Sequence, residues 1–164
     1  MNYESDIYIL AEIKRYSTCF TIRQESVAEH GFFVAALVME LNDKYNFNLT
    51  NGLMMAIAHD MPEIELNDAS HVLKKNYPEI KEAFDVCERR VAKTLPTNCR
   101  LGVQMYDAND SIAATVVHLA DAIQCRQFAK VEVSLGNQGY MLKVLRSSEE
   151  RIKILEQQLE RYMK

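Results

Sequence analysis

Glycine and proline are scarce in this chain, with five glycines and three prolines among 164 residues. These two residues mark most turns and interrupt helices, so their scarcity favours long regular elements. The apolar residues recur at intervals of three and four positions, which is the spacing of amphipathic helices and not of strands. The sequence therefore predicts an all-α fold.

Six helices follow from this spacing and from the residues that cap helix ends. Ser26 and Glu29 form a capping box at the start of the longest early helix, because each side chain can satisfy a free backbone donor of the other. Thr50 or Asn51 is expected to cap the third helix. A loop is expected over residues 15–24 and a turn region over 63–70. The predicted helices are a short one through Ile7, Leu10 and Ile13, followed by 26–45, 50–60, 78–95, 111–135 and 148–163.

Composition indicates a single domain over residues 1–164. Hydrophobic residues make up 48% and charged residues 26% of the chain, which are ordinary proportions for a folded protein. A net charge of −4 provides no broad positive field for a nucleic acid polymer. The longest apolar run, 31–39, is too short to cross a bilayer. With no visible signal peptide and four scattered cysteines, we expect a reduced, cytoplasmic protein without membrane contact, acting on small molecules.

Four residues on three predicted helices are candidate ligands of a metal ion: His30, His59, Asp60 and Asp121. Taken singly, a core histidine or a His-Asp pair has an ordinary structural explanation. Asp121, however, lies in an apolar helical stretch, where a carboxylate without a partner is costly to bury. Two imidazoles and two carboxylates together suit cobalt, manganese, zinc, iron or nickel better than magnesium. The sequence predicts an open site for one such divalent ion, with room for water and phosphate oxygen.

The order of these residues resembles the signature of the HD-domain phosphohydrolase superfamily: a histidine, a His-Asp pair and a later aspartate on a helical bundle. The surrounding segments resemble the bacterial 5′-deoxynucleotidases of this superfamily over residues 15–137. The resemblance implies a single-domain HD-type bundle and a homodimer or higher homo-oligomer. The similar segments are Arg15-Tyr16, RQESVAEH at 23–30, HDMPE at 59–63, Asn67-Asp68, Lys74, LADA at 119–122 and LGN at 135–137.

The same resemblance assigns catalytic positions to Glu63 and Asp68. A carboxylate can take a proton from water, and a carboxylic acid can give one to a departing alkoxide, so either residue could be base, nucleophile or acid. Arg15, Arg23 and Lys74 are candidate phosphate contacts, because guanidinium groups bind phosphate oxygens bidentately and lysine adds a compact charge. For Arg23 and Lys74 an ordinary surface role explains the sequence equally well.

Two departures from the family pattern concern the side of the site that faces substrate. Tyr16 stands where the family has tryptophan, and we expect its ring to stack on a base or sugar. The segment Asn67-Asp68-Ala69-Ser70 replaces a Gly-Asp-x-Pro pattern, which leaves the conformation of that loop open.

The resemblance implies a 5′-deoxynucleotidase, which cleaves a deoxyribonucleoside 5′-monophosphate to nucleoside and phosphate. Related phage enzymes with the same segments instead remove triphosphate from deoxynucleoside triphosphates, notably dATP, and the segments do not separate the two substrates. A third hypothesis is a nucleotide-binding or signalling module without turnover. The complete ligand set and the presence of both Glu63 and Asp68 argue against that module.

Overall fold

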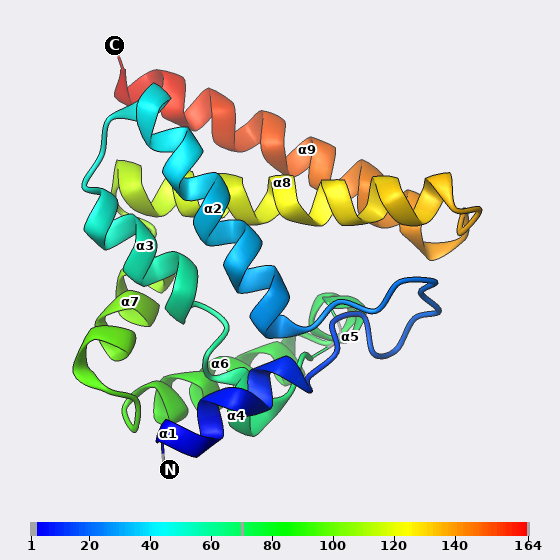
Figure 1. Ribbon diagram of the computed structural model, residues 1–164, viewed down its shortest axis with the longest axis horizontal. Coiled ribbons are helices and arrows are strands. Elements are labelled where there is room, and N and C mark those ends of the chain that lie inside the picture. Colours follow the sequence, from blue (N-terminus) through cyan, green and yellow to red (C-terminus); the bar gives the residue numbers. More distant parts are fainter. Residues whose placement is uncertain (1–2, 70, 164) are drawn as a thin grey trace.

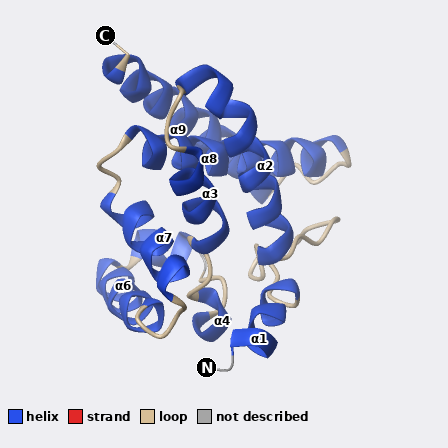
Figure 2. Ribbon diagram, turned by 60° about the vertical axis from the view of Figure 1, so that its left-hand side comes forward, coloured by secondary structure: helices blue, strands red, loops and turns tan. Residues whose placement is uncertain are grey.

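The computed structural model describes residues 3–69 and 71–163, and their secondary structure is helical (Figures 1 and 2). Within those ranges the chain forms no strand, and a single antiparallel bridge joins Lys14 to Ser26. This confirms the all-α prediction. The helices are α1 (Tyr3–Asp6), the 3-10 helix η1 (Ile7–Ala11), α2 (Val27–Tyr45), α3 (Leu49–Ala58), α4 (Glu63–Leu66), α5 (His71–Asn76), α6 (Pro78–Ala92), α7 (Thr97–Ala108), α8 (Ile112–Ser134) and α9 (Tyr140–Tyr162).

Helix α8 runs through the middle of the bundle and packs against α2, α3, α7 and α9 (Figure 1). Its N-cap is Ser111, whose hydroxyl accepts a hydrogen bond from the amide of Ala114 at 3.1 Å. The first turns are mostly apolar and are buried on several sides, including Ala113, Thr115, Val116 and Val117. A helix with apolar side chains on several sides is stable only when it is buried in a core. The other helices therefore surround α8.

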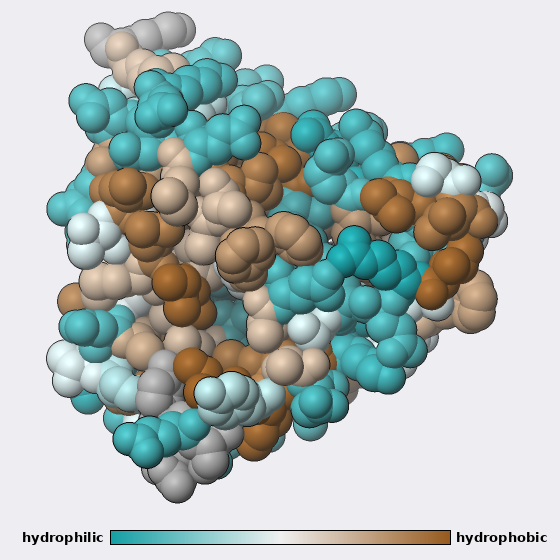
Figure 3. Space-filling model, in the orientation of Figure 1, coloured by the Kyte–Doolittle hydropathy of each residue, from teal (hydrophilic) through white to brown (hydrophobic). Residues whose placement is uncertain are grey.

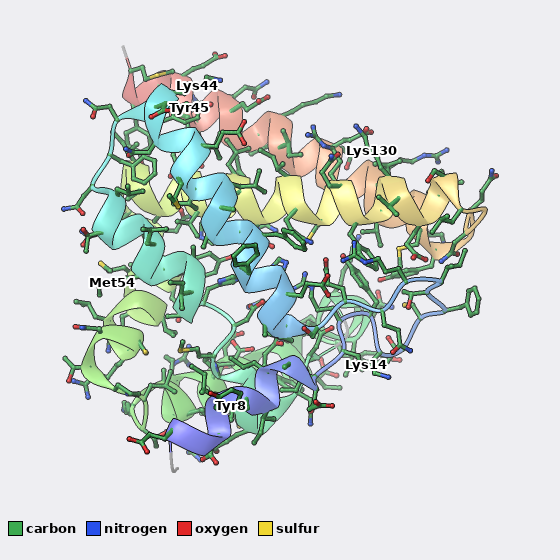
Figure 4. The ribbon with its side chains drawn as sticks, viewed as in Figure 1. Tyr8, Lys14, Lys44, Tyr45, Met54 and Lys130 are labelled. Atoms are coloured by element: carbon green, nitrogen blue, oxygen red, sulfur yellow. The ribbon has the colours of Figure 1, made fainter. Side chains whose placement is uncertain are left out.

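Helix α2 follows Ser26, whose side-chain oxygen accepts from the amide of Glu29 at 3.1 Å as predicted. The other half of the predicted capping box differs, because the carboxylate of Glu29 pairs with Arg23. It ends at Tyr45, and Asn46 turns the chain in a left-handed conformation with φ of 44°. Figure 4 shows Lys44 and Tyr45 at this C-terminal end, where Tyr45 joins a core of α8 and α9 side chains. His30 lies one turn from the opposite end of the same helix.

Helices α3 and α7 approach closely because Gly102 of α7 has no side chain. A Cβ at this position would lie 2.5 Å from the carbonyl oxygen of Met54 and 2.9 Å from the Cβ of Ala58. Any side chain here would push the two helices apart. The contact supports the C-terminal end of α3, where His59 and Asp60 follow.

Several predicted boundaries were wrong. The cap of α3 is Asn48, which accepts from the amide of Asn51, and not Thr50 or Asn51. Residues 63–66 form the short helix α4 inside the expected turn region, and α5 and α7 were not predicted at all. Helix α9 begins at Tyr140 and not near residue 148, because its first two turns pack on the end of α8.

No helix in the described residues is both long and apolar enough to cross a membrane. Figure 3 shows apolar residues on the viewed face near the end of α8. The exposed large apolar side chains of that helix end and of the loop 15–24 are Phe20, Ile22, Val131 and Leu135.

Candidate metal centre and active site

Three helices bring the predicted metal ligands together. His30 comes from α2, His59 and Asp60 follow the last residue of α3, and Asp121 comes from α8. The Nε2 atom of His30 lies 3.3 Å from Nε2 of His59, 3.5 Å from Oδ2 of Asp60 and 3.4 Å from Oδ1 of Asp121. Donor atoms of His30, His59 and Asp121 lie within 4.8 Å of one another, which is compatible with one shared ion.

Neighbouring groups set both histidines to present Nε2 to the centre. Gln124 donates from Nε2 to the carboxylate of Glu25 at 2.6 Å, so its oxygen faces His30, and Nδ1 of His30 donates to that oxygen at 2.7 Å. Nδ1 of His59 donates to the carbonyl oxygen of Ala56 at 2.9 Å. The two Nε2 atoms face each other over 3.3 Å, so a proton or a metal ion must lie between them, and metal-binding histidines have this arrangement.

The electrostatics of the centre also favour a cation. Burial by itself would raise the pKa of Asp60 and Asp121, but His59 beside Asp60, and His30 with Arg151 beside Asp121, hold both pKa values below their ordinary range. Burial and the charge of Arg15 lower the pKa of His30, whereas Asp60 outweighs the effect of burial on His59 and raises its pKa. The residues present fit a divalent ion, which two carboxylates and two imidazole nitrogens can hold once the ion has displaced any proton from the imidazoles.

Arg15 lies directly beside these donors. Its guanidinium donates to Oδ2 of Asp60 at 3.1 Å and lies 3.6 Å from the buried carboxylate of Glu25 and 3.5 Å from Sγ of Cys125. Although burial opposes its charge, the neighbouring acidic groups raise the pKa of Arg15, so it is always a cation. The structure therefore places a fixed positive charge next to the metal ligands.

Glu63 and Asp68 lie on the segment that follows the His-Asp pair. Oε2 of Glu63 is buried and finds no hydrogen-bond partner among the described residues. Burial, together with the charges of Asp60 and Asp68, raises the pKa of Glu63 to about 9. Asp68 accepts a hydrogen bond from the amide of Tyr16 at 3.0 Å, so its carboxylate ties the segment after α4 to the loop that carries Arg15.

Tyr16 occupies a left-handed backbone position with φ of 58°. Its ring stacks on Phe128 of α8, with centroids 5.1 Å apart and planes inclined by 7°. One face of the ring is therefore covered by the protein. Tyr16 also lines the cavity described below, so it remains beside the space that a substrate would enter.

Glu132 of α8 anchors the rest of this loop. Its fully buried carboxylate accepts from the amides of Ile22 at 2.8 Å and Arg23 at 2.7 Å, and from Nδ2 of Asn137 at 2.7 Å. Asn137 in turn donates to the carbonyl oxygen of Phe20. This anchor could not be predicted from the sequence, because Glu132 looks there like any polar residue on a helix.

Two predicted phosphate contacts, Arg23 and Lys74, form ion pairs with glutamates that are not among the metal ligands. The guanidinium of Arg23 pairs with Glu29 at the surface. Lys74 of α5 pairs with Glu88 of α6 at 2.8 Å and lies over the ring of Phe84. The structure thus groups Arg15, but not Arg23 or Lys74, with the metal ligands.

A cavity of about 520 Å³ opens on this centre. It is lined by Arg15, Tyr16, Asp68 and Asp121, and on the α9 side by Lys143 and Arg151, among others. Lys143 lies before the predicted start of the last helix at residue 148, and Arg151, which lies inside that predicted helix, looks in the sequence like an ordinary surface arginine. A row of α8 residues that recurs at three and four positions supports the whole arrangement: Asp121, Gln124, Cys125, Phe128 and Glu132.

Comparison with known proteins agrees with this geometry. The HD domain family matches residues 9–161. The chain is 23% identical over 146 residues to 4′-phosphooxetanocin A phosphatase of Priestia megaterium, a match that covers 82% of this chain and 75% of that protein.

Two solved structures share the fold. The PH0347 protein of Pyrococcus horikoshii has a TM-score of 0.80 and 24% identity, with 96% of this chain and 90% of that chain covered. An HD phosphohydrolase of cyanophage S-2L, bound to dA and one catalytic Zn²⁺, has a TM-score of 0.74 and 22% identity, with 99% and 95% covered. Because the family match spans almost the whole sequence and the four ligand positions converge, the chain belongs to the HD domain family.

Proposed function

We propose that this protein, a metal-dependent phosphohydrolase, cleaves deoxyribonucleoside 5′-monophosphates to deoxynucleoside and inorganic phosphate. One observation carries the proposal: the cavity of about 520 Å³ is lined at once by a metal ligand, Asp121, and by the fixed cation of Arg15. Its volume lies within the range of small-molecule sites, roughly 300–1,000 Å³. A phosphate ester in this space would have its anionic oxygens beside both the ion and the guanidinium.

The residues divide the work of hydrolysis among them. A divalent ion held by His30, His59, Asp60 and Asp121 would supply Lewis acidity toward a phosphate oxygen and make water more acidic. Arg15 offsets the negative charge that changes on the phosphate as the bond to the 5′-oxygen breaks. Water adds its oxygen to phosphorus, the 5′-oxygen leaves with a proton, and the products are an alcohol and phosphate.

Glu63 and Asp68 are the carboxyl groups we propose for the two proton movements. Glu63 has a buried oxygen without a hydrogen-bond partner among the described residues, which leaves it available to exchange a proton. Asp68 lines the cavity while its other contact holds the amide of Tyr16. Tyr16 lies between this carboxylate and Phe128, where its ring can contact a sugar or base.

The relatives support a nucleotide substrate. One is a phosphatase and another binds dA together with a catalytic zinc ion. A deoxynucleoside triphosphate, cleaved to deoxynucleoside and triphosphate, is the second candidate. Lys75 and Lys143 favour it, since both line the cavity and add positive charge beyond that of Arg15.

Incubation with dAMP and with dATP, followed by chromatography of the products, tests the proposal. Deoxyadenosine and phosphate from dAMP are the expected products, and chelator-treated protein is the control. Deoxyadenosine and triphosphate from dATP, with no release from dAMP, would favour the second candidate. Binding of metal and nucleotide without any hydrolysis would show a binding module and overturn the proposed activity.

A further inference from the structure

Arg151 of α9 reaches the metal centre from a part of the chain that the sequence analysis left without a function. Its Nη1 donates to Oδ2 of Asp121 at 2.8 Å, and its Nη2 lies 3.4 Å from Nδ1 of His118. The phenol of Tyr106 also donates to Oδ2 of Asp121, at 3.4 Å. The other carboxylate oxygen, Oδ1, faces His30. Arg151 therefore holds the side of Asp121 that is not directed at the ion.

Much of the Arg151 guanidinium remains available for other partners. An arginine carries five N–H donors in a planar fork, and the two contacts above use only part of them. The side chain of Arg151 is 43% exposed, against 14% for Arg15, and it lines the same cavity as Arg15. Burial opposes its charge, but Asp121 and Tyr106 raise the pKa of Arg151, so it is a permanent cation.

Arg15 and Arg151 each donate a hydrogen bond to one of the proposed carboxylate ligands. Arg15 donates to Asp60 and Arg151 donates to Asp121, so each carboxylate ligand has its own guanidinium, and both guanidiniums reach one cavity. An anion drawn to the ion would meet both of them. Guanidinium groups suit phosphate because two parallel N–H bonds can reach two oxygens of the same group.

We propose that Arg151 is a substrate-binding residue that donates hydrogen bonds to nonbridging oxygens of the substrate phosphate, alongside Arg15. The inference rests on the proposed function only in taking a phosphate ester as the substrate. A competing explanation is that Arg151 does no more than orient Asp121, in which case its removal would weaken metal binding and leave the affinity for phosphate per metal-loaded site unchanged.

Binding of orthophosphate to the cobalt-loaded protein separates these explanations, with calorimetry for affinity and elemental analysis for bound metal. We expect Arg151→Met to keep its cobalt and to bind orthophosphate roughly 10- to 100-fold more weakly, since a charge-assisted contact is lost. Arg146→Met is the matched control, because Arg146 lies on the same helix in an exposed position outside the cavity lining. The control should stay within twofold of wild type.

Arg151→Lys provides the second variant if the methionine substitution prevents folding. Lysine keeps the positive charge but not the planar fork, so a loss of several-fold in orthophosphate affinity is expected. Unchanged orthophosphate affinity in either variant, or loss of cobalt in proportion to the loss of phosphate binding, would overturn the inference. A protein that hydrolyses no nucleotide yet needs Arg151 for orthophosphate binding would refute the proposed function and leave this inference standing.

Discussion

Replacing Glu132 with glutamine tests whether the loop that carries Arg15 depends on its anchor in α8. Glu132 is fully buried and its carboxylate accepts three hydrogen bonds, from the amides of Ile22 and Arg23 and from the side chain of Asn137. Glutamine has nearly the same shape but offers one oxygen. Whichever way its amide turns, at least one of these donors faces an NH₂ group instead of an acceptor.

The expected cost follows from that count. One bond to a charged acceptor contributes about 1.5–3 kcal/mol, and a buried donor left without a partner costs about 1–3 kcal/mol, with overlap between the two effects. We therefore expect the variant to lose about 2–4 kcal/mol of the free energy of unfolding. Against a usual total of about 5–15 kcal/mol, this is a large fraction.

The loss should depend on pH in a definite direction. Burial opposes ionisation of Glu132, but Asn137 and the amides of Arg23 and Ile22 lower its pKa below the ordinary value of 4.5. A lowered pKa in the folded state stabilises the protein above the unfolded value, and this contribution disappears as pH falls through the folded value. The difference in the free energy of unfolding between wild type and variant should be largest at pH 7. It should become smaller as the pH falls below the ordinary pKa of 4.5.

Urea denaturation of chelator-treated protein at a series of pH values measures this difference without a contribution from bound metal. Hydrogen exchange should also become faster over residues 17–24 in the variant. Glu149→Gln, at an exposed position of α9, is the control and should change stability by less than about 0.5 kcal/mol. A Glu132→Gln protein as stable as wild type at pH 7, or a difference that does not vary with pH, would refute the reasoning.

Four further predictions concern the centre and its support. Asp121→Ala should lose bound metal and turnover together, whereas Glu63→Ala should keep the metal and lose turnover, and equal metal loss in elemental analysis would contradict this division. Chelator-treated protein should be inactive, and Co²⁺ or Mn²⁺ should restore more hydrolysis than Mg²⁺, because two imidazoles are borderline ligands; full activity of metal-verified apoprotein would count against this. Gly102→Ala should lower the free energy of unfolding by about 1–3 kcal/mol, since its Cβ would lie 2.5 Å from a carbonyl oxygen. Thermal denaturation measures this loss, and an unchanged midpoint would show that α3 and α7 can separate freely. Tyr16→Ala should mainly raise KM, while Arg15→Ala should lower kcat as well, because only the guanidinium contacts a group whose charge changes during cleavage. Steady-state kinetics measures both constants. If kcat and KM of Arg15→Ala stay near the wild-type values, Arg15 is not a phosphate contact.

The sequence predicted those helices whose ends and buried faces are indicated by residues close in the sequence. Ser26 accepts from the amide of Glu29, as predicted for a cap of α2, and α8 begins after Ser111, close to the predicted start of that helix. Helix α7 was missed because its burial comes from contact with α3 through Gly102, and a glycine inside a helix weakens a local prediction. The start of α9 was misplaced for the same reason, since its first turns are stabilised by packing on α8.

The sequence was enough to propose the metal donors because their residue types carry the chemistry, and the structure brings three of them, His30, His59 and Asp121, together. An aspartate in an apolar stretch of helix needs a partner wherever it is found, and in the structure the Nε2 atom of His30 lies 3.4 Å from Asp121. Arg151 and Glu132 could not be found in this way. Arginine and glutamate are ordinary on helix surfaces, and only the packing of distant segments shows that their partners are Asp121 and the 22–23 amides.

The single row of residues along α8 limits how the length of this chain can change. The metal ligand Asp121, the His30 support Gln124, the Tyr16 support Phe128 and the loop anchor Glu132 all use one face of the same helix. Each residue turns a helix by about 100°, so one residue inserted between Asp121 and Glu132 would rotate the second half of the row away from the first. We therefore expect insertions and deletions between Asp121 and Glu132 to disrupt the site. The chain after Asn137 can tolerate a change of length better, because an added Cβ on Gly139 meets nothing within 4 Å.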